Sequence, residues 1–124
     1  MTDTPGAAQL DVQLDTESHS GIHILTVGGQ IDAATSGQLE RALTDAEPGV
    51  ERGVVLDLSA VDFIDSTGLR VISRSIARLT ADDRALAAVA PPGPVRRLVE
   101  LTALTGHFRL SDSQDQAIGA LPGG

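Results

Sequence analysis

Residues 54–69 read V-V-L-D-L-S-A-V-D-F-I-D-S-T-G-L, and this stretch decides the fold. Its first five residues form a nearly continuous apolar run rich in β-branched side chains, which predicts a strand covered on both faces. The polar cluster Asp65-Ser66-Thr67-Gly68 ends the β-rich segment, and an amphipathic helical pattern follows it. A buried strand that passes through a polar turn into a helix indicates one βα unit of a parallel sheet.

Two strands are predicted before this unit. Residues 10–15 alternate apolar and acidic side chains, as a half-buried edge strand does. A second, more buried strand is predicted over 21–29 and is closed by Gly28-Gly29. The residues between the two strands have the length of a hairpin turn, so the pair is expected to be antiparallel.

One helix is predicted before the central strand in the sequence, and another after it. The first follows Asp32, with Thr35 or Ser36 as its cap, and ends at Pro48. The second begins in the polar cluster. Their apolar stripes consist of Leu39, Ala42, Leu43 and Ala46 in the first helix, and Leu69, Ile72, Ile76 and Leu79 in the second. The other side of the second helix carries Arg70, Arg74 and Arg78, which predicts a solvated surface.

The last third of the chain adds two more strands and two more helices. A fourth strand is predicted over 85–90, followed by a helix with Pro94 in its first turn and Gly106 at its end. Residues 107–110 predict a short last strand, and 111–121 a short terminal helix. The order ββαβαβαβα predicts an α/β fold with a mostly parallel sheet, right-handed crossovers and an antiparallel N-terminal edge strand.

Composition excludes several kinds of chemistry. The 17 acidic residues against 9 basic ones give a net charge of -8, which argues against binding nucleic acid or anionic membranes. Every basic residue is arginine, so a Walker lysine and a Schiff-base lysine are impossible. The chain has no cysteine, and its three histidines show no ligand spacing. We therefore expect neither a metal nor a cofactor.

The chain is expected to form one domain without a targeting segment. Residues 1–8 have neither the basic region nor the apolar stretch of a signal peptide, and no apolar run approaches the length of a membrane span. We expect a cytoplasmic protein with a flexible tail at 1–8, a single domain over 9–120 and a second tail at 121–124.

The polar cluster at 65–68 allows two interpretations. As a structural element, Asp65 or Ser66 caps the following helix, which contributes about 1 kcal/mol, and Gly68 permits a tight corner. As a functional element, the cluster lies at the carboxyl end of a parallel strand, where sites gather. A phosphate on Ser66 would be stabilised by the first-turn N–H groups and the helix dipole. It would place a charge of about -2 at a contact surface.

Two enzymatic interpretations meet obstacles. The cluster resembles the hydrolase motif G-x-S-x-G, but Ile64 replaces its first glycine. His107 and either Asp82 or Asp83 follow in triad order, yet a chain of 124 residues leaves little room for a substrate pocket. Asp57 resembles a phospho-accepting aspartate, but the lysine that such sites need is missing. We expect Asp57 at the strand's carboxyl end, hydrogen-bonded by loop amides, and we expect no enzymatic activity.

Three stretches together resemble STAS domains, and specifically bacterial anti-sigma factor antagonists. They are G-G-Q-I-D-A-A-T (28–35), the segment 54–69 and P-P-G-P-V-R-R-L-V-E-L-T-A-L (91–104). The resemblance runs from about residue 9 to residue 120, and the middle stretch is the most specific. It implies the STAS fold, which agrees with the predicted order of strands and helices.

The resemblance also implies a phosphorylation switch. In this family an anti-sigma factor that acts as a serine kinase phosphorylates the serine after the motif aspartate. That residue is Ser66 here, and Thr67 is an alternative acceptor. The unphosphorylated protein binds the anti-sigma factor and releases the sigma factor, phosphorylation breaks the complex, and a serine phosphatase resets it. The implied docking surface consists of Gly29, Asp32, Asp65, Ser66, Thr67, Gly68 and Leu69.

Two residues depart from the family pattern. Gln30 replaces an acidic residue, which changes the charge of the docking surface, and Thr67 stands where many members have a second serine. Other members of the family are stressosome-type scaffolds or small subunits of lipid-transport ABC complexes. The alternative to the switch is therefore a constitutive STAS adaptor without phosphorylation, because a fold alone does not define the docking partner.

Overall fold

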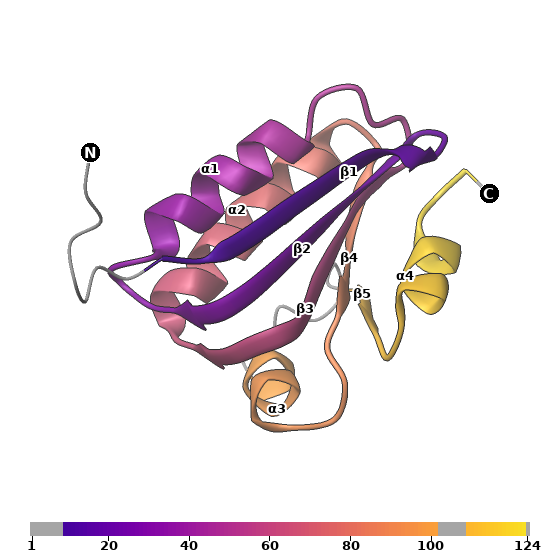
Figure 1. The fold of residues 1–124 in the computed structure, drawn as a ribbon. Coiled ribbons are helices and arrows are strands. Elements are labelled where there is room, and N and C mark those ends of the chain that lie inside the picture. Colours follow the sequence, from indigo (N-terminus) through magenta and orange to yellow (C-terminus); the bar gives the residue numbers. More distant parts are fainter. Residues whose placement is uncertain (1–8, 102–108, 124) are drawn as a thin grey trace.

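A five-stranded sheet forms the centre of the fold in the computed structural model, which describes residues 9–101 and 109–123 (Figure 1). Its strands, in order across the sheet, are β1 (Asp11–His19), β2 (Ile22–Ile31), β3 (Gly53–Ile64), β4 (Ala85–Val89) and β5 (Arg109–Ser111). The helices are α1 (Ser36–Ala46), α2 (Ser66–Ala81), α3 (Pro94–Leu101) and α4 (Gln114–Ala120). β1 pairs with β2 antiparallel, and the other neighbours are parallel. The predicted α/β order ββαβαβαβα is confirmed.

The helices cover the two faces of the sheet unequally (Figure 1). α1 and α2 pack on one face, and α4 packs on the other; we call these the α1/α2 face and the α4 face. Side chains alternate along β3, so Val54 and Leu56 lie in the α1/α2 core while Val55 lies in the smaller core under α4. The apolar run at 54–58 is therefore buried on both sides, as its composition predicts.

The strands extend further than the sequence pattern predicts. β1 continues to His19, so the hairpin turn is reduced to Ser20 and Gly21, and the longer turn predicted there is wrong. β2 runs through Gly28 and Gly29 rather than ending at them, because backbone pairing with β3 continues to Ile31. β1 is also more exposed than a half-buried strand, because its side chains lie at the open edge of the sheet.

Two irregularities in β3 interrupt the alternation of its side chains near its carboxyl end. From the pair Thr26–Asp57 to the pair Gly28–Ala60, β2 advances two residues and β3 three. A second extra residue, Asp62, lies between the partners of Gly29 and Gln30. Each bulge shifts the alternation by one residue. Because there are two bulges, the shifts cancel: only Val61, between them, reaches the α1/α2 core out of step, and Ile64 returns to that core while Phe63 is exposed.

Asp57 lies inside β3 rather than at its end. Its carboxylate is buried and accepts a hydrogen bond from the Ser59 backbone N–H at 2.9 Å and from Gln114 Nε2 at 2.7 Å. The expected loop amides are thus replaced by one strand amide and one side chain of α4. The strand continues past Asp57 because its pairing with β2 outlasts its pairing with β4.

A buried carboxylate holds α2 against α1. Glu47 follows α1 and accepts hydrogen bonds from Ser75 Oγ at 2.6 Å and from Arg78 Nε at 2.7 Å. The hydrogen bond to this carboxylate raises the pKa of the Arg78 guanidinium above its usual value, and burial opposes the rise. Arg74 and Arg78 also approach Glu40. The arginine side of α2, predicted to be a solvated surface, is therefore partly an inter-helix contact.

Some of the features predicted near the two ends of the chain fall on residues that the structure does not describe, and others can be compared with it. The predicted tail at 1–8, the end of the third helix at Gly106 and the start of the last strand at 107–108 lie outside the described residues. Leu121 is buried beneath α4, and Arg52 Nε donates a hydrogen bond to the Pro122 carbonyl at 2.8 Å. The chain is thus still part of the domain at these residues, beyond the boundary predicted at 120. None of the described helices combines the length and the apolar composition of a membrane span.

Candidate functional site

Two polar turns lie side by side at the carboxyl ends of β2 and β3. Ile31 and Ile64 are paired in the parallel ladder, so the residues that follow them enter neighbouring turns. The Asp65 backbone N–H donates a hydrogen bond to the Ile31 carbonyl at 3.1 Å and fixes one turn to the other. Asp32 and Asp65, far apart in the sequence, therefore begin adjacent turns at the sheet edge where parallel α/β folds carry their sites.

The Asp32 turn is closed by its own side chains. Asp32 Oδ1 accepts hydrogen bonds from the backbone N–H groups of Ala34 at 2.9 Å and Thr35 at 3.2 Å. The buried Thr35 hydroxyl donates to the Gln30 carbonyl at 2.7 Å. It also accepts from the Asp32 N–H at 3.0 Å. Thr35 precedes α1, but its hydroxyl makes no capping bond to the helix and holds the turn instead.

Asp65 is the N-cap of α2. Its Oδ1 accepts a hydrogen bond from the Thr67 backbone N–H at 2.9 Å and another from the Thr67 hydroxyl. The bond from the Thr67 hydroxyl, helped by the backbone N–H groups of Thr67 and Gly68, holds the pKa of Asp65 below its usual value, and desolvation opposes this shift. The capping interpretation of the cluster is therefore confirmed, and it uses the aspartate and the threonine.

Ser66 differs from both of its neighbours. It is exposed at the first residue of α2, and its hydroxyl makes no hydrogen bond to any described residue. Thr67 is half-buried, and its hydroxyl is engaged with Asp65. The cap therefore leaves one free hydroxyl on the surface, and that hydroxyl lies at the N-terminal end of a helix, where a negative charge is favoured.

The other predicted docking residues are less exposed than Ser66 and lie partly or wholly under this surface. Gly68 is buried, and a Cβ built on it would lie 2.3 Å from Ile31 Cγ2 and 3.0 Å from Ile64 Cγ1. Leu69 is buried in the α1/α2 core. Gly29 is half-buried with a φ of 109°, next to the second bulge. The accessible part of the predicted surface thus consists of the exposed Ser66 and the half-buried Gly29, Asp32, Asp65 and Thr67.

The hydrolase interpretation is contradicted by distance. Asp82 is the C-cap of α2, and Asp83 follows it, so both lie at the opposite end of a 16-residue helix from Ser66. At 1.5 Å per residue this separation is about 24 Å, far beyond the reach of a catalytic triad. The third candidate, His107, lies outside the described residues. Among the described part of the chain, no group of three or more potential ligands could hold a metal ion.

We expect replacement of Thr67 by valine to raise the pKa of Asp65 toward that of an ordinary aspartate. The threonine hydroxyl is the largest cause of the lowered pKa, and valine keeps the shape without the hydroxyl. Because a lowered pKa stabilises the fold above the unfolded-state value, wild type should gain stability relative to the variant above pH ~4 and lose that gain as the pH falls through the folded pKa. NMR titration of the Asp65 carboxyl measures this change; an unchanged pKa would show that the hydroxyl is not its cause.

Sequence reasoning missed the large apolar side chain that lies beside the site. Phe63 precedes the buried Ile64 and Asp65, and 48% of its surface is exposed. The pattern 54–69 contained the signal: alternation from Leu56 and Leu58 places Ile64 in the same core and Phe63 on the opposite face, and the two one-residue bulges of β3 cancel. How much of that opposite face is covered depends on α4, which the pattern does not show.

Comparison with known proteins gives a consistent result. The STAS domain model matches residues 13–117. The anti-sigma-F factor antagonist RsfB of Mycobacterium tuberculosis is 29% identical over 113 residues, which cover 91% of this chain and 92% of RsfB. The anti-sigma-B factor antagonist of Staphylococcus aureus is 27% identical over 106 residues, covering 86% and 98% of the two chains. A crystal structure of an anti-sigma factor antagonist from Mycobacterium paratuberculosis superposes with a TM-score of 0.80 at 30% identity, covering 91% and 94%.

Proposed function

Because this chain belongs to the STAS domain family, we propose that it is an anti-sigma factor antagonist whose binding is controlled by phosphorylation of Ser66. Its similarity to named antagonists over nearly its whole length supports the first part of this proposal. The observation that carries the second part is the free, exposed Ser66 hydroxyl beside a Thr67 hydroxyl that is already engaged by Asp65.

The proposed switch acts through charge and not through refolding. A phosphate on Ser66 would lie at the N-terminal end of α2, where the helix dipole favours an anion. Arg70, one turn further on, is exposed and forms no ion pair with the described residues, so it adds a positive charge at i+4. The domain therefore tolerates the phosphate, while a partner packed against Ser66 would have to bury a charge of about -2.

The proposed partners are those that the resemblance to anti-sigma factor antagonists implies. The unphosphorylated form binds an anti-sigma factor and releases the sigma factor, and the same anti-sigma factor acts as the serine kinase. A serine phosphatase returns the protein to its binding form, and all of these steps take place in the cytoplasm. The chain itself contributes a docking surface and a phosphate acceptor and catalyses no reaction.

Phosphate transfer in vitro tests the acceptor. The protein is incubated with ATP and the recombinant anti-sigma factor of its source organism, and the modified residue is mapped by mass spectrometry. We expect phosphate on Ser66 in wild type and in Thr67→Val, and none in Ser66→Ala. Phosphate on Thr67 in wild type would move the site to the neighbouring residue. Stable binding without any phosphate transfer would instead favour the constitutive adaptor.

A further inference from the structure

The α4 face of the sheet is covered only along part of its length within the described residues. α4 packs over the amino-terminal halves of the central strands, where Ile22, Ile24 and Val55 form a buried cluster with Ala117. Beyond this cluster, toward the carboxyl ends of β2 and β3, Gln30, Ala60 and Phe63 are exposed. We call these three residues the open patch. It lies on the opposite side of the sheet from α2 and adjoins the turn that carries Ser66.

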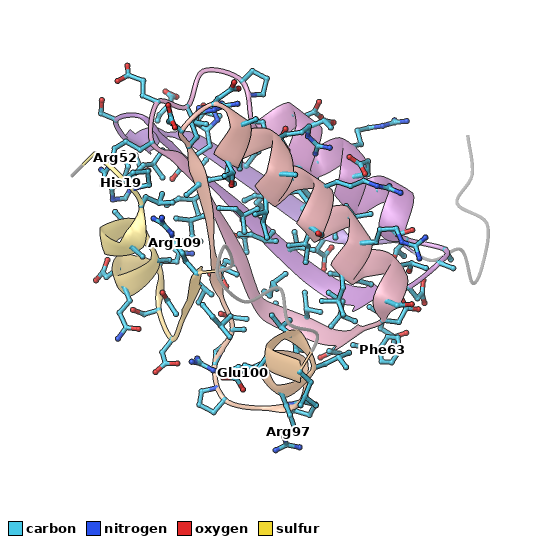
Figure 2. All side chains as sticks on the ribbon, turned by 180° about the vertical axis from the view of Figure 1, so that it is seen from behind. His19, Arg52, Phe63, Arg97, Glu100 and Arg109 are labelled. Atoms are coloured by element: carbon cyan, nitrogen blue, oxygen red, sulfur yellow. The ribbon has the colours of Figure 1, made fainter. Side chains whose placement is uncertain are left out.

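Phe63 dominates the open patch. It is one of only two aromatic residues in the chain, and nearly half of its surface is in contact with solvent. Figure 2 shows its ring at the outer rim of the molecule, beyond the end of the sheet and near the start of α2. Leaving such a ring in water gives up the burial energy that a phenylalanine usually contributes to folding. Phenylalanine is among the residues enriched at the centres of protein interfaces.

The surroundings of Phe63 specify what fits it. Its ladder partner is the uncharged Gln30, and Ala60 adds a small apolar side chain, so the centre of the patch is neutral. Three acidic residues adjoin this centre: the exposed Asp62 directly precedes Phe63, the half-buried Asp65 follows it by two residues, and the exposed Asp11 lies on the neighbouring β1. Asp11 is paired with Gly28, whose ladder partner on the other side is Ala60. The combination is an apolar centre with an acidic rim.

We propose that Phe63 anchors the anti-sigma factor, which contacts both faces of the sheet at the carboxyl end of β3. This inference rests on the proposed function and extends its surface: one part of the partner contacts Ser66 at the start of α2, and another reaches past the end of β3 onto the open patch. The partner presents an apolar pocket for the ring and basic side chains for the acidic rim. In a chain with a net charge of -8, such a rim selects a positively charged partner.

The geometry explains why the two parts of this surface act together. Phe63 and Ser66 are three residues apart, and between them Ile64 is buried and Asp65 is fixed to the Ile31 carbonyl. The ring and the hydroxyl are therefore held on one rigid segment, so a partner loses little entropy in ordering them. Charge on Ser66 would then disturb a contact whose apolar half lies immediately beside it.

Alanine replacement of Phe63 tests the anchor. Binding of the recombinant anti-sigma factor of the source organism is measured by titration calorimetry with wild type, Phe63→Ala and the control Val12→Ala. Val12 is similarly exposed, at 41%, but its side chain lies on the α1/α2 face of the edge strand. We expect Phe63→Ala to weaken binding about 30-fold, mainly by faster dissociation, and Val12→Ala to change it by less than about twofold. Thermal unfolding of the free variants checks that each is folded.

Fluorine NMR supplies a direct readout of the contact. Labelling with 4-fluorophenylalanine gives two resonances, one for each phenylalanine of the chain, and Phe63→Leu assigns them. We expect the Phe63 resonance to shift when the anti-sigma factor is added. Raising the salt concentration should slow association, because the acidic rim acts by long-range attraction.

The outcomes distinguish the failure of this inference from the failure of the proposed function on which it rests. If wild type binds, Ser66→Glu releases the partner, and Phe63→Ala binds like wild type with an unmoved resonance, the anchor is refuted while the antagonist function stands. If wild type does not bind the anti-sigma factor at all, both the anchor and the antagonist function are refuted. Equal losses for Phe63→Ala and Val12→Ala would also refute the anchor, because the effect would not be specific to the open patch.

Discussion

The Ser66→Glu variant is expected to bind the anti-sigma factor about 100-fold more weakly than wild type, a loss of about 2.7 kcal/mol. The glutamate places a negative charge where the free hydroxyl contacts the partner, and an interface that closes over this position must bury the charge unpaired. Ser66→Ala removes the acceptor without adding charge. It should bind like wild type and should not be released on addition of ATP.

Stability measurements distinguish this effect from unfolding. α2 has no acidic residue in its first turn, so a glutamate at Ser66 meets a favourable helix dipole. The thermal unfolding temperature should therefore be unchanged or slightly higher. Ser73→Glu adds the same charge two turns along the same helix and should leave binding within about twofold of wild type. If both glutamate variants bind equally well, the charge switch at Ser66 does not exist.

The Gly53→Ala variant is expected to lose about 3–5 kcal/mol of folding stability, the largest effect expected from alanine at any of the described glycines. Gly53 begins β3 with a φ of 149°, and a Cβ there would lie 1.9 Å from the Ala85 backbone oxygen. A backbone oxygen cannot turn aside as a side chain can. Accommodating the methyl group would separate β3 from β4 at the point where their parallel pairing begins.

Two other glycines provide matched controls for this prediction. Gly49 also has a positive φ, of 79°, but nothing lies within 4 Å of the place that an added methyl group would occupy, so alanine there should cost only about 1 kcal/mol of conformational strain. Gly37 lies in α1 with open space around it, and alanine should stabilise by about 0.5–1 kcal/mol. Denaturant unfolding gives all three values. A cost below about 1 kcal/mol for Gly53→Ala would show that the strands can separate freely.

The elements that depend on local patterns could be predicted from the sequence. The apolar stripe at Leu39, Leu43 and Ala46 and the run at 54–58 are buried as expected, because burial and period are written in neighbouring residues. The strand ends could not be predicted in the same way. β1 and β2 continue through polar residues and glycines, because there the backbone ladder and not the side chains maintains the pairing.

The candidate site shows the same division. The capping role of Asp65 follows from its residue type before a helix, and the structure confirms it. The asymmetry between Ser66 and Thr67 depends on which hydroxyl turns toward the carboxylate, and no sequence pattern contains that information. The exposure of Phe63 depends on how far α4 reaches along its face of the sheet, because α4 covers Ile22, Ile24 and Val55 but not Phe63, and no local pattern contains that information.

Because the Asp65–Thr67 cap leaves the Ser66 hydroxyl without a hydrogen bond to any described residue, the stability of the domain and its signalling are separable. Substitutions at Ser66 should escape the proteolysis that removes poorly folded chains, so the cell would keep them at normal abundance. A lost serine would then produce a persistently bound antagonist, and a gained acidic residue a permanently silent one. Such alleles would behave as signalling defects with ordinary protein levels, whereas changes at Gly53 should act through depletion of the protein.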